Sequence, residues 1–178
     1  MKVLTLIGGI SKNSINKNLF AQIKSLSPKE MEFEVFDIST LPYFSLDVEN
    51  NMPEVAMTFK DKISKADAVL IVTPEYNRSM PGVLKNAIDY ASRPYGKSVW
   101  PKKPAGVLGA GAGGVGAFGS QKHAKDTLSY LGALVMWQPE IYFNYPANIN
   151  EKGELAEASK KYFAGYFEAF KNWIEKNK

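Results

Sequence analysis

Short apolar runs alternate along this chain with longer segments in which apolar residues recur every three or four positions. The apolar runs, which have the character of strands, lie at 2–9, 31–38, 67–74, 103–114 and 133–137. Apolar residues at helical spacing mark the segments 14–26, 54–66, 81–92, 118–132 and 154–176. This alternation predicts five strand–helix units and therefore an α/β protein with a parallel sheet.

Two of the runs also indicate their place in the sheet. Residues 67–74 are apolar almost throughout, which is typical of a central strand that is buried on both faces. Residues 31–38 alternate charged and apolar side chains, which fits a half-exposed edge strand, and 39–53 has no clear period and reads as a long loop. We therefore expect one domain over 1–178, an open sheet with helices on both faces.

Composition narrows the possible chemistry. The 178 residues include no cysteine and only one histidine, His123, so we expect no disulfide, no thiolate nucleophile and no metal site. We assign His123 to a structural role or a subunit contact. The net charge of +4 is spread along the chain, without the dense basic stripe of a nucleic-acid-binding surface. No apolar run approaches the about 20 residues of a membrane span, and the N-terminal run is too short for a signal peptide, so we expect a cytoplasmic protein.

In open parallel sheets, ligands bind beyond the carboxyl ends of the strands, and three unusual segments fall at such ends. The first is Gly8 to Asn18, which follows the first strand. Backbone N–H groups and hydroxyls at a helix N-terminus form an anion site, with phosphate as the usual occupant. One serine would be explained as an ordinary helix cap, but Ser11, Asn13, Ser14 and Asn16 together, after a pair of glycines, are harder to explain in that way and favour phosphate. The candidate phosphate-binding residues are Gly9, Ser11, Ser14 and Asn16. It is not a Walker loop, because that motif is absent.

The second segment, Pro74 to Arg78, ends the predicted central strand. Pro74 stiffens the exit of the strand and has no N–H group that needs an acceptor. Backbone donors and acceptors and an aromatic ring at Glu75, Tyr76 and Asn77 suit a planar polar ligand. An ordinary strand-to-helix loop is the alternative, although such a loop seldom carries so many distinctive residues in a row.

The third segment, Gly109 to Gly119, contains two overlapping GxGxxG patterns. We reject a dinucleotide fingerprint, because that motif follows the first strand and needs an acidic residue about 20 positions later, where this chain has leucine. Glycines here instead let backbone N–H groups approach a ligand closely, and the candidates are Gly111, Ala112, Gly113 and Gly114. Phosphate at the first strand and a flat ring at the next two loops predict FMN in a flavodoxin-like fold.

These segments resemble the NADPH-dependent FMN reductases, a family that includes quinone, chromate and azo-dye reductases. The resemblance runs along nearly the whole chain and is carried by "SINKNLF", "TPEYNRSMPGVLKNAIDYASRP", "GVGAFGSQKHAKDTL" and "MWQPE". It implies a five-stranded sheet of order 2-1-3-4-5 and hydride transfer from NADPH or NADH through FMN to quinones, azo compounds or similar acceptors. It also implies a homodimer or homotetramer, and no catalytic side chain is required because the flavin carries the reaction.

The chain departs from the family pattern at three positions. Gly9 and Ser11 stand where the family usually has serine and arginine, and Gly119 stands where another arginine is common. The arginine of the phosphate loop would make a bidentate charged contact, and Lys12 and Lys17 are the charges nearest to that loop. Two other functions stay open at this point: a flavodoxin-type electron carrier, and a binding module of the same fold that has lost FMN. The carriers are strongly acidic, whereas this chain is net positive.

Overall fold

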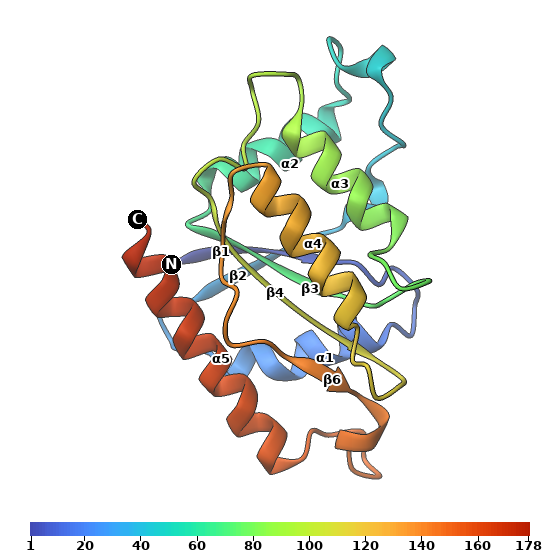
Figure 1. Ribbon diagram of the computed structural model, residues 1–178, viewed down its shortest axis with the longest axis vertical. Coiled ribbons are helices and arrows are strands. Elements are labelled where there is room, and N and C mark those ends of the chain that lie inside the picture. Colours follow the sequence, from blue (N-terminus) through green and yellow to red (C-terminus); the bar gives the residue numbers. More distant parts are fainter.

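A parallel sheet forms the centre of the protein, seen in a computed structural model that describes residues 1–178 (Figure 1). The strands are β1 (Lys2–Ile7), β2 (Glu32–Phe36), β3 (Ala68–Thr73), β4 (Pro104–Gly111) and β5 (Leu134–Val135), in the order β2-β1-β3-β4-β5. This order confirms the predicted flavodoxin-like topology. As predicted, β2 lies at an edge and β3 is central, with every residue buried.

The fifth position of the sheet differs from the predicted single strand at 133–137. It is filled by two short strands, β5 beside the start of β4 and β6 (Tyr142–Asn144) beside its end. The chain leaves the sheet after Met136, whose N–H still donates to Ala105, and Pro139 in the gap has no N–H group to contribute to a ladder. The break lets β6 extend the sheet at the carboxyl end of β4, where Gly111 pairs with Asn144.

Helices cover both faces of the sheet (Figure 1). One face carries α2 (Glu54–Lys65), α3 (Gly82–Ser92) and α4 (Phe118–Tyr130), and the other carries α1 (Ile15–Ile23) and α5 (Glu157–Lys176). Four short 3-10 helices lie between them, at Lys24–Leu26, Ile38–Thr40, Leu46–Val48 and Pro146–Asn148. The segment 39–53, predicted as a loop, contains the third of these and part of the second.

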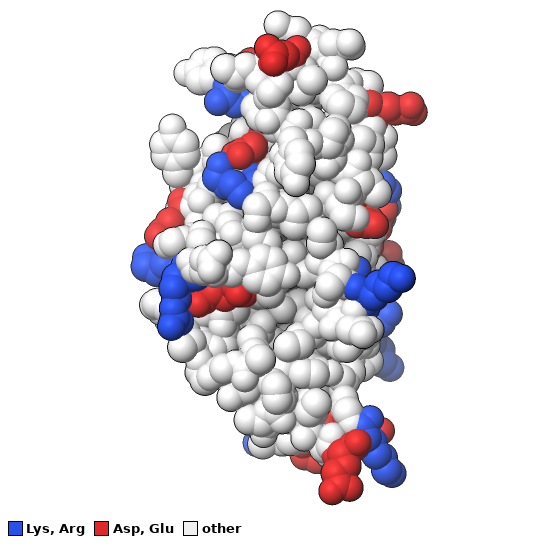
Figure 2. All heavy atoms as spheres, turned by 90° about the vertical axis from the view of Figure 1, so that its right-hand side faces the viewer, with Lys and Arg blue, Asp and Glu red and all other residues white.

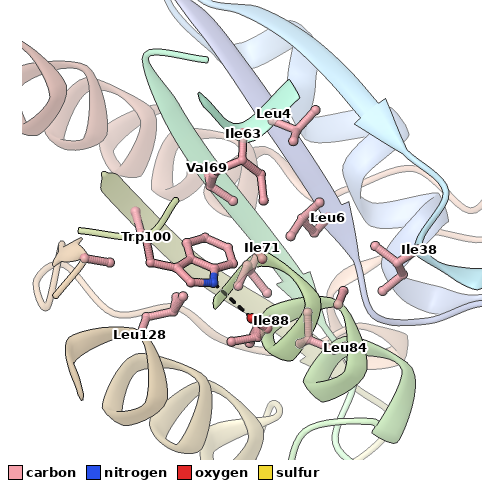
Figure 3. Close-up of a cluster of buried hydrophobic side chains, with 14 of the residues drawn as sticks. Leu4, Leu6, Ile38, Ile63, Val69, Ile71, Leu84, Ile88, Trp100 and Leu128 are labelled. Atoms are coloured by element: carbon pink, nitrogen blue, oxygen red, sulfur yellow. Dashed lines mark hydrogen bonds between the residues drawn. The ribbon is translucent and has the colours of Figure 1, made fainter. Parts of the chain in front are cut away.

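Alternate residues of the central strands feed two separate cores. Val69 and Ile71 of β3 pack under α2, α3 and α4, whereas Leu70 and Val72 pack under α1 and α5. Figure 3 shows the first core, where the buried Trp100 donates from Nε1 to the carbonyl of Ile88 on α3, at 3.0 Å. These two cores hold the strands in place, and they therefore set the positions at which the loops leave the sheet.

The loops that follow β1, β3 and β4 meet at the carboxyl edge of the sheet, on the right of Figure 1. Figure 2 shows the molecule from that side, where most of the visible face is formed by uncharged residues. None of the helices has the length and apolar character needed to cross a bilayer.

Candidate active site

The loop between β1 and α1 ends at the N-terminus of α1, where two backbone N–H groups have no hydrogen-bond acceptor. Ser14 is the buried N-cap of α1, and its Oγ accepts a hydrogen bond from the N–H of Lys17 at 3.4 Å. The N–H groups of Ile15 and Asn16 have no acceptor in the chain. These groups, together with the helix dipole, could hold an anion such as a phosphate.

Asn16 has a different role from the one expected of its side chain. It is buried, and both of its polar ends bind the backbone of Ala110 in β4: Nδ2 donates to the carbonyl and Oδ1 accepts from the N–H, each at 3.0 Å. Asn16 therefore fixes the start of α1 against the carboxyl end of β4, and its backbone N–H is the one polar group of this residue left without a side-chain or backbone partner at the helix start.

Gly9 explains one departure from the family pattern. A Cβ atom at Gly9 would lie 2.2 Å from Oγ of Ser14, so a serine at position 9 requires this hydroxyl to move. The N-cap serine thus occupies space that a side chain at position 9 would otherwise fill. Lys17 holds the same loop by donating from Nζ to the carbonyl of Ile10 at 3.1 Å. Ser11 and Lys12 are exposed.

Residues Tyr76 to Ser79 form a tight turn at the exit of β3. The N–H of Tyr76 donates to the carbonyl of Ser79, and the N–H of Ser79 donates back to Tyr76, both at 3.0 Å. Asn77 and Arg78 between them have positive φ angles of 50° and 63°, the conformation of a type I′ turn. Asparagine accepts this conformation readily, whereas arginine is strained in it.

The side chain of Glu75 caps α4 across the site. Its Oε2 accepts from the N–H of Gly119 at 2.6 Å and from that of Ser120 at 3.3 Å, and its Oε1 lies 3.3 Å from a guanidinium nitrogen of Arg78. A Cβ atom at Gly119 would lie 2.6 Å from the carbonyl oxygen of Arg78. Glycine at position 119 thus permits the loop after β3 to lie directly on the N-terminus of α4.

The glycine-rich loop divides into two parts. Gly111 and Ala112 line the same cavity as the β1–α1 loop, whereas Gly113 and Gly114 do not. A Cβ atom at Gly113 or Gly114 would meet no atom within 4 Å, so both face open space. The N–H groups of Ala112, Gly113 and Gly114 have no acceptor in the chain, which leaves three donors beside the cavity.

A cavity of about 260 Å³ joins these loops. Of the predicted site residues, it brings together Gly9, Ser11, Ser14, Asn16, Pro74, Glu75, Tyr76, Gly111 and Ala112. Asn13, which belongs to the polar set of the predicted phosphate loop, also lines it, and so does Ile15, which the sequence did not indicate. Asn77, Arg78, Gly113 and Gly114 lie outside its lining. His123 also lies outside, where its Nδ1 is 2.9 Å from Oγ of Ser79.

The residues present fit FMN. Unpaired N–H groups at the start of α1 suit a terminal phosphate, and the loop after β3 supplies a flat wall formed by Pro74 and Tyr76. On the opposite side, the free N–H of Ala112 suits the polar edge of an isoalloxazine ring. The fold and this site define a class: flavodoxin-like oxidoreductases that bind FMN at the carboxyl edge of a parallel sheet.

Comparison with known proteins identifies the family within this class. The model of the NADPH-dependent FMN reductase family matches residues 1–147, and the chain belongs to this family. A 2-hydroxy-1,4-benzoquinone reductase from Burkholderia sp. is 41% identical over 176 residues, which cover 98% of this chain and 96% of the relative. An NAD(P)H-dependent FMN reductase of Pseudomonas aeruginosa is 35% identical, with 99% and 96% covered.

A solved structure agrees with these relatives. The flavoenzyme NAD(P)H:(acceptor) oxidoreductase of Paracoccus denitrificans superposes with a TM-score of 0.93 at 38% identity, over 99% of this chain and 98% of that one. The predicted family, fold and oxidoreductase class are thereby confirmed, with FMN as the cofactor and NAD(P)H as the co-substrate. Membership of this family favours the enzyme over the electron carrier and over the binding module without FMN.

Proposed function

We propose that this protein is a quinone reductase, which transfers hydride from NADPH or NADH to a quinone or a similar flat acceptor when FMN is bound. The names of the relatives support this acceptor class, and the cavity built by three strand-end loops is the observation that carries the proposal. FMN supplies the redox chemistry when bound. Azo compounds remain further candidate acceptors of the same flat shape.

The protein's own part is to bind, orient and stabilise charge. We assign phosphate binding to Ser14 and to the N–H groups of Ile15 and Asn16. The ring would lie between Pro74–Tyr76 and the glycine-rich loop. Donors from Ala112 to Gly114 would stabilise the negative charge that reduction places on the pyrimidine side of the ring. No side chain is needed as acid or base.

The kinetic pattern tests this function. The exposed turn at Asn77 and Arg78 leaves one side of the site open, so a single position beside the ring would serve NAD(P)H and the acceptor in turn. Initial rates with NADPH at several fixed quinone concentrations should give parallel double-reciprocal lines, the mark of a ping-pong mechanism. Converging lines would mean that both substrates bind together, and no turnover at all would refute the proposal.

We also propose that two copies of the chain associate through the surface formed by α3, α4 and the loop 39–53. A hollow of about 740 Å³ lies between these elements. Tyr130 and Leu46 line it and are 88% and 66% exposed, so that two large apolar side chains of the single chain face solvent beside charged neighbours. Sedimentation at micromolar concentration should give a dimer or tetramer, and a monomeric mass would contradict this.

The NAD(P)H requirement also supports the cytoplasm as the place of action.

A further inference from the structure

The glycine-rich loop carries unpaired donors between two ends that the rest of the chain holds. At the entry of the loop, the side chain of Asn16 binds both backbone groups of Ala110. The N–H of Tyr145 then donates to the carbonyl of Gly111 at 3.1 Å. The N–H groups at 112–114 have no acceptor in the chain. Their positions therefore depend on how the entry and the exit of the loop are held.

Gln121, in the first turn of α4, holds the exit of this loop. Its side chain is fully buried, and its Nε2 donates to the carbonyl of Gly116 at 3.2 Å and to that of Ile141 at 2.7 Å. Ile141 comes directly before β6, the strand that pairs with the entry of the loop at Gly111. The Oε1 of Gln121 is buried without a donor in the chain, so the two carbonyls alone set the orientation of the amide.

The exit of the loop has an unusual backbone that needs support. Gly116 has a φ angle of 56°, and a Cβ atom there would lie 2.2 Å from the carbonyl carbon of Tyr142, so the loop lies directly on β6. Ala117 follows with a φ angle of 63°, which a residue with a Cβ atom keeps only when its surroundings hold it there. Gln121 is the side chain that bonds to this limb. Without its two hydrogen bonds, we expect the limb to relax away from β6.

We propose that Gln121 is a positioning residue, which holds the donors at 112–114 where they favour the reduced cofactor over the oxidised one. The proposal rests on the proposed function and deepens it by naming the side chain that tunes the site. NAD(P)H gives up a hydride, which is two electrons and one proton, and leaves as NAD(P)+, so the ring gains one negative charge. Fixed N–H groups stabilise such a charge well only while they stay aligned with it.

Two glutamines provide a matched test. Gln22 on α1 also holds a distant segment: its Nε2 donates to the carbonyl of Gly153, and its Oε1 accepts from the N–H of Leu155, both at 3.0 Å. It makes no hydrogen bond to the glycine-rich loop. Methionine at either position keeps the length of the side chain, removes its hydrogen bonds and changes no charge. Both variants should lose stability in thermal unfolding, but only Gln121→Met should alter the bound cofactor.

The reduction potential of bound FMN is a readout that a purely structural glutamine would not move. In Gln121→Met, the affinity for reduced FMN relative to oxidised FMN should fall about three- to tenfold, which lowers the two-electron midpoint potential by about 15–30 mV. Gln121→Asn retains a shorter amide and should recover part of this loss. Gln22→Met should have the potential of the unmodified protein. Equal potentials throughout, or equal shifts in both methionine variants, would overturn the proposal.

Hydrogen exchange of the protein without FMN tests the attachment of the loop separately. The N–H groups of Gly116 and Phe118 bond to carbonyls within the loop, at 3.3 and 3.2 Å. They should exchange about tenfold faster in Gln121→Met and at the unmodified rate in Gln22→Met. Unchanged exchange would overturn the proposal, and Gln121→Asn gives the same comparison if Gln121→Met does not fold.

The two failures can be told apart. An unmodified protein that binds no FMN would refute the proposed function, while hydrogen exchange still decides whether Gln121 holds the loop. An unmodified protein that binds FMN and reduces a quinone, with a potential that does not respond to Gln121→Met, would refute only the role of Gln121.

Discussion

Replacing Glu75 by alanine should lower the stability of the protein as well as its affinity for FMN. The Glu75 side chain is 13% exposed, and its carboxylate accepts from two N–H groups in the first turn of α4. It therefore joins the loop after β3 to a helix that begins 43 positions later, at Phe118. Without the carboxylate, these two donors lose their partner, and the wall of the cofactor cavity loses its attachment to α4.

The expected size of the effect follows from these contacts. Loss of a helix cap costs about 0.5–2 kcal/mol, and a hydrogen bond to a charged group is worth about 1.5–3 kcal/mol. The ion pair with Arg78 adds little, since the arginine side chain is 76% exposed. We therefore expect Glu75→Ala to cost about 2–3 kcal/mol. For a chain of this size, that lowers Tm by roughly 5–10 °C.

Thermal unfolding of the protein without FMN measures this cost directly. Glu75→Gln keeps an acceptor oxygen and should lose about half as much. Glu157→Ala is the matched control, because Glu157 lies in the first turn of α5 but is 88% exposed and accepts only from the side chain of Lys160. That change should shift Tm by no more than a degree or two. If Glu75→Ala unfolds at the temperature of the Glu157 variant, the cap does not stabilise the protein and this reasoning is wrong.

The other predictions concern the phosphate loop, the turn after β3 and an ion pair behind α4. Ser14→Ala should weaken FMN binding about tenfold or more in a fluorescence titration, and Ser11→Arg, which restores the family's charge, should tighten it; the reverse order would place the phosphate elsewhere. Arg78→Gly should raise the free energy of unfolding by roughly 0.5–1 kcal/mol, because glycine relieves the strain of a φ of 63°; a destabilised variant would exclude that strain. Burial raises the pKa of Glu140, but hydrogen bonds from its neighbours, including the buried Lys125, outweigh it and hold the pKa below its ordinary value. The resulting stability is present above the ordinary pKa and is lost as pH falls through the lower folded value. Glu140→Gln should therefore destabilise the protein at neutral pH and much less at about pH 3 in urea unfolding; a loss that does not depend on pH would contradict the pKa assignment.

Local patterns in the sequence predicted most of the fold. The apolar run at 67–74 identified β3 as the buried central strand, and the alternation at 31–38 placed β2 at an edge. The fifth strand was predicted only in part, because the division into β5 and β6 depends on how each piece pairs with β4. Pairing between distant segments leaves no local periodicity in the sequence.

The candidate site shows the same difference between local sequence patterns and contacts of distant segments. The positions of Ser14 and of Pro74 to Tyr76 follow from the rule that ligands bind at carboxyl strand ends. The side-chain roles of Asn16 and Glu75 could not be predicted, because their partners lie 94 and 44 residues away along the chain.

Binding of FMN is the central claim, and a titration tests it most directly. Adding FMN to the purified protein without other cofactors should quench the flavin fluorescence with a sharp end point at one FMN per chain, and FAD should bind more weakly because the loop encloses a terminal phosphate. Ser25→Ala, in the 3-10 helix that follows α1, should titrate as the unmodified protein does. A protein that neither carries nor takes up FMN would contradict the account of all three loops.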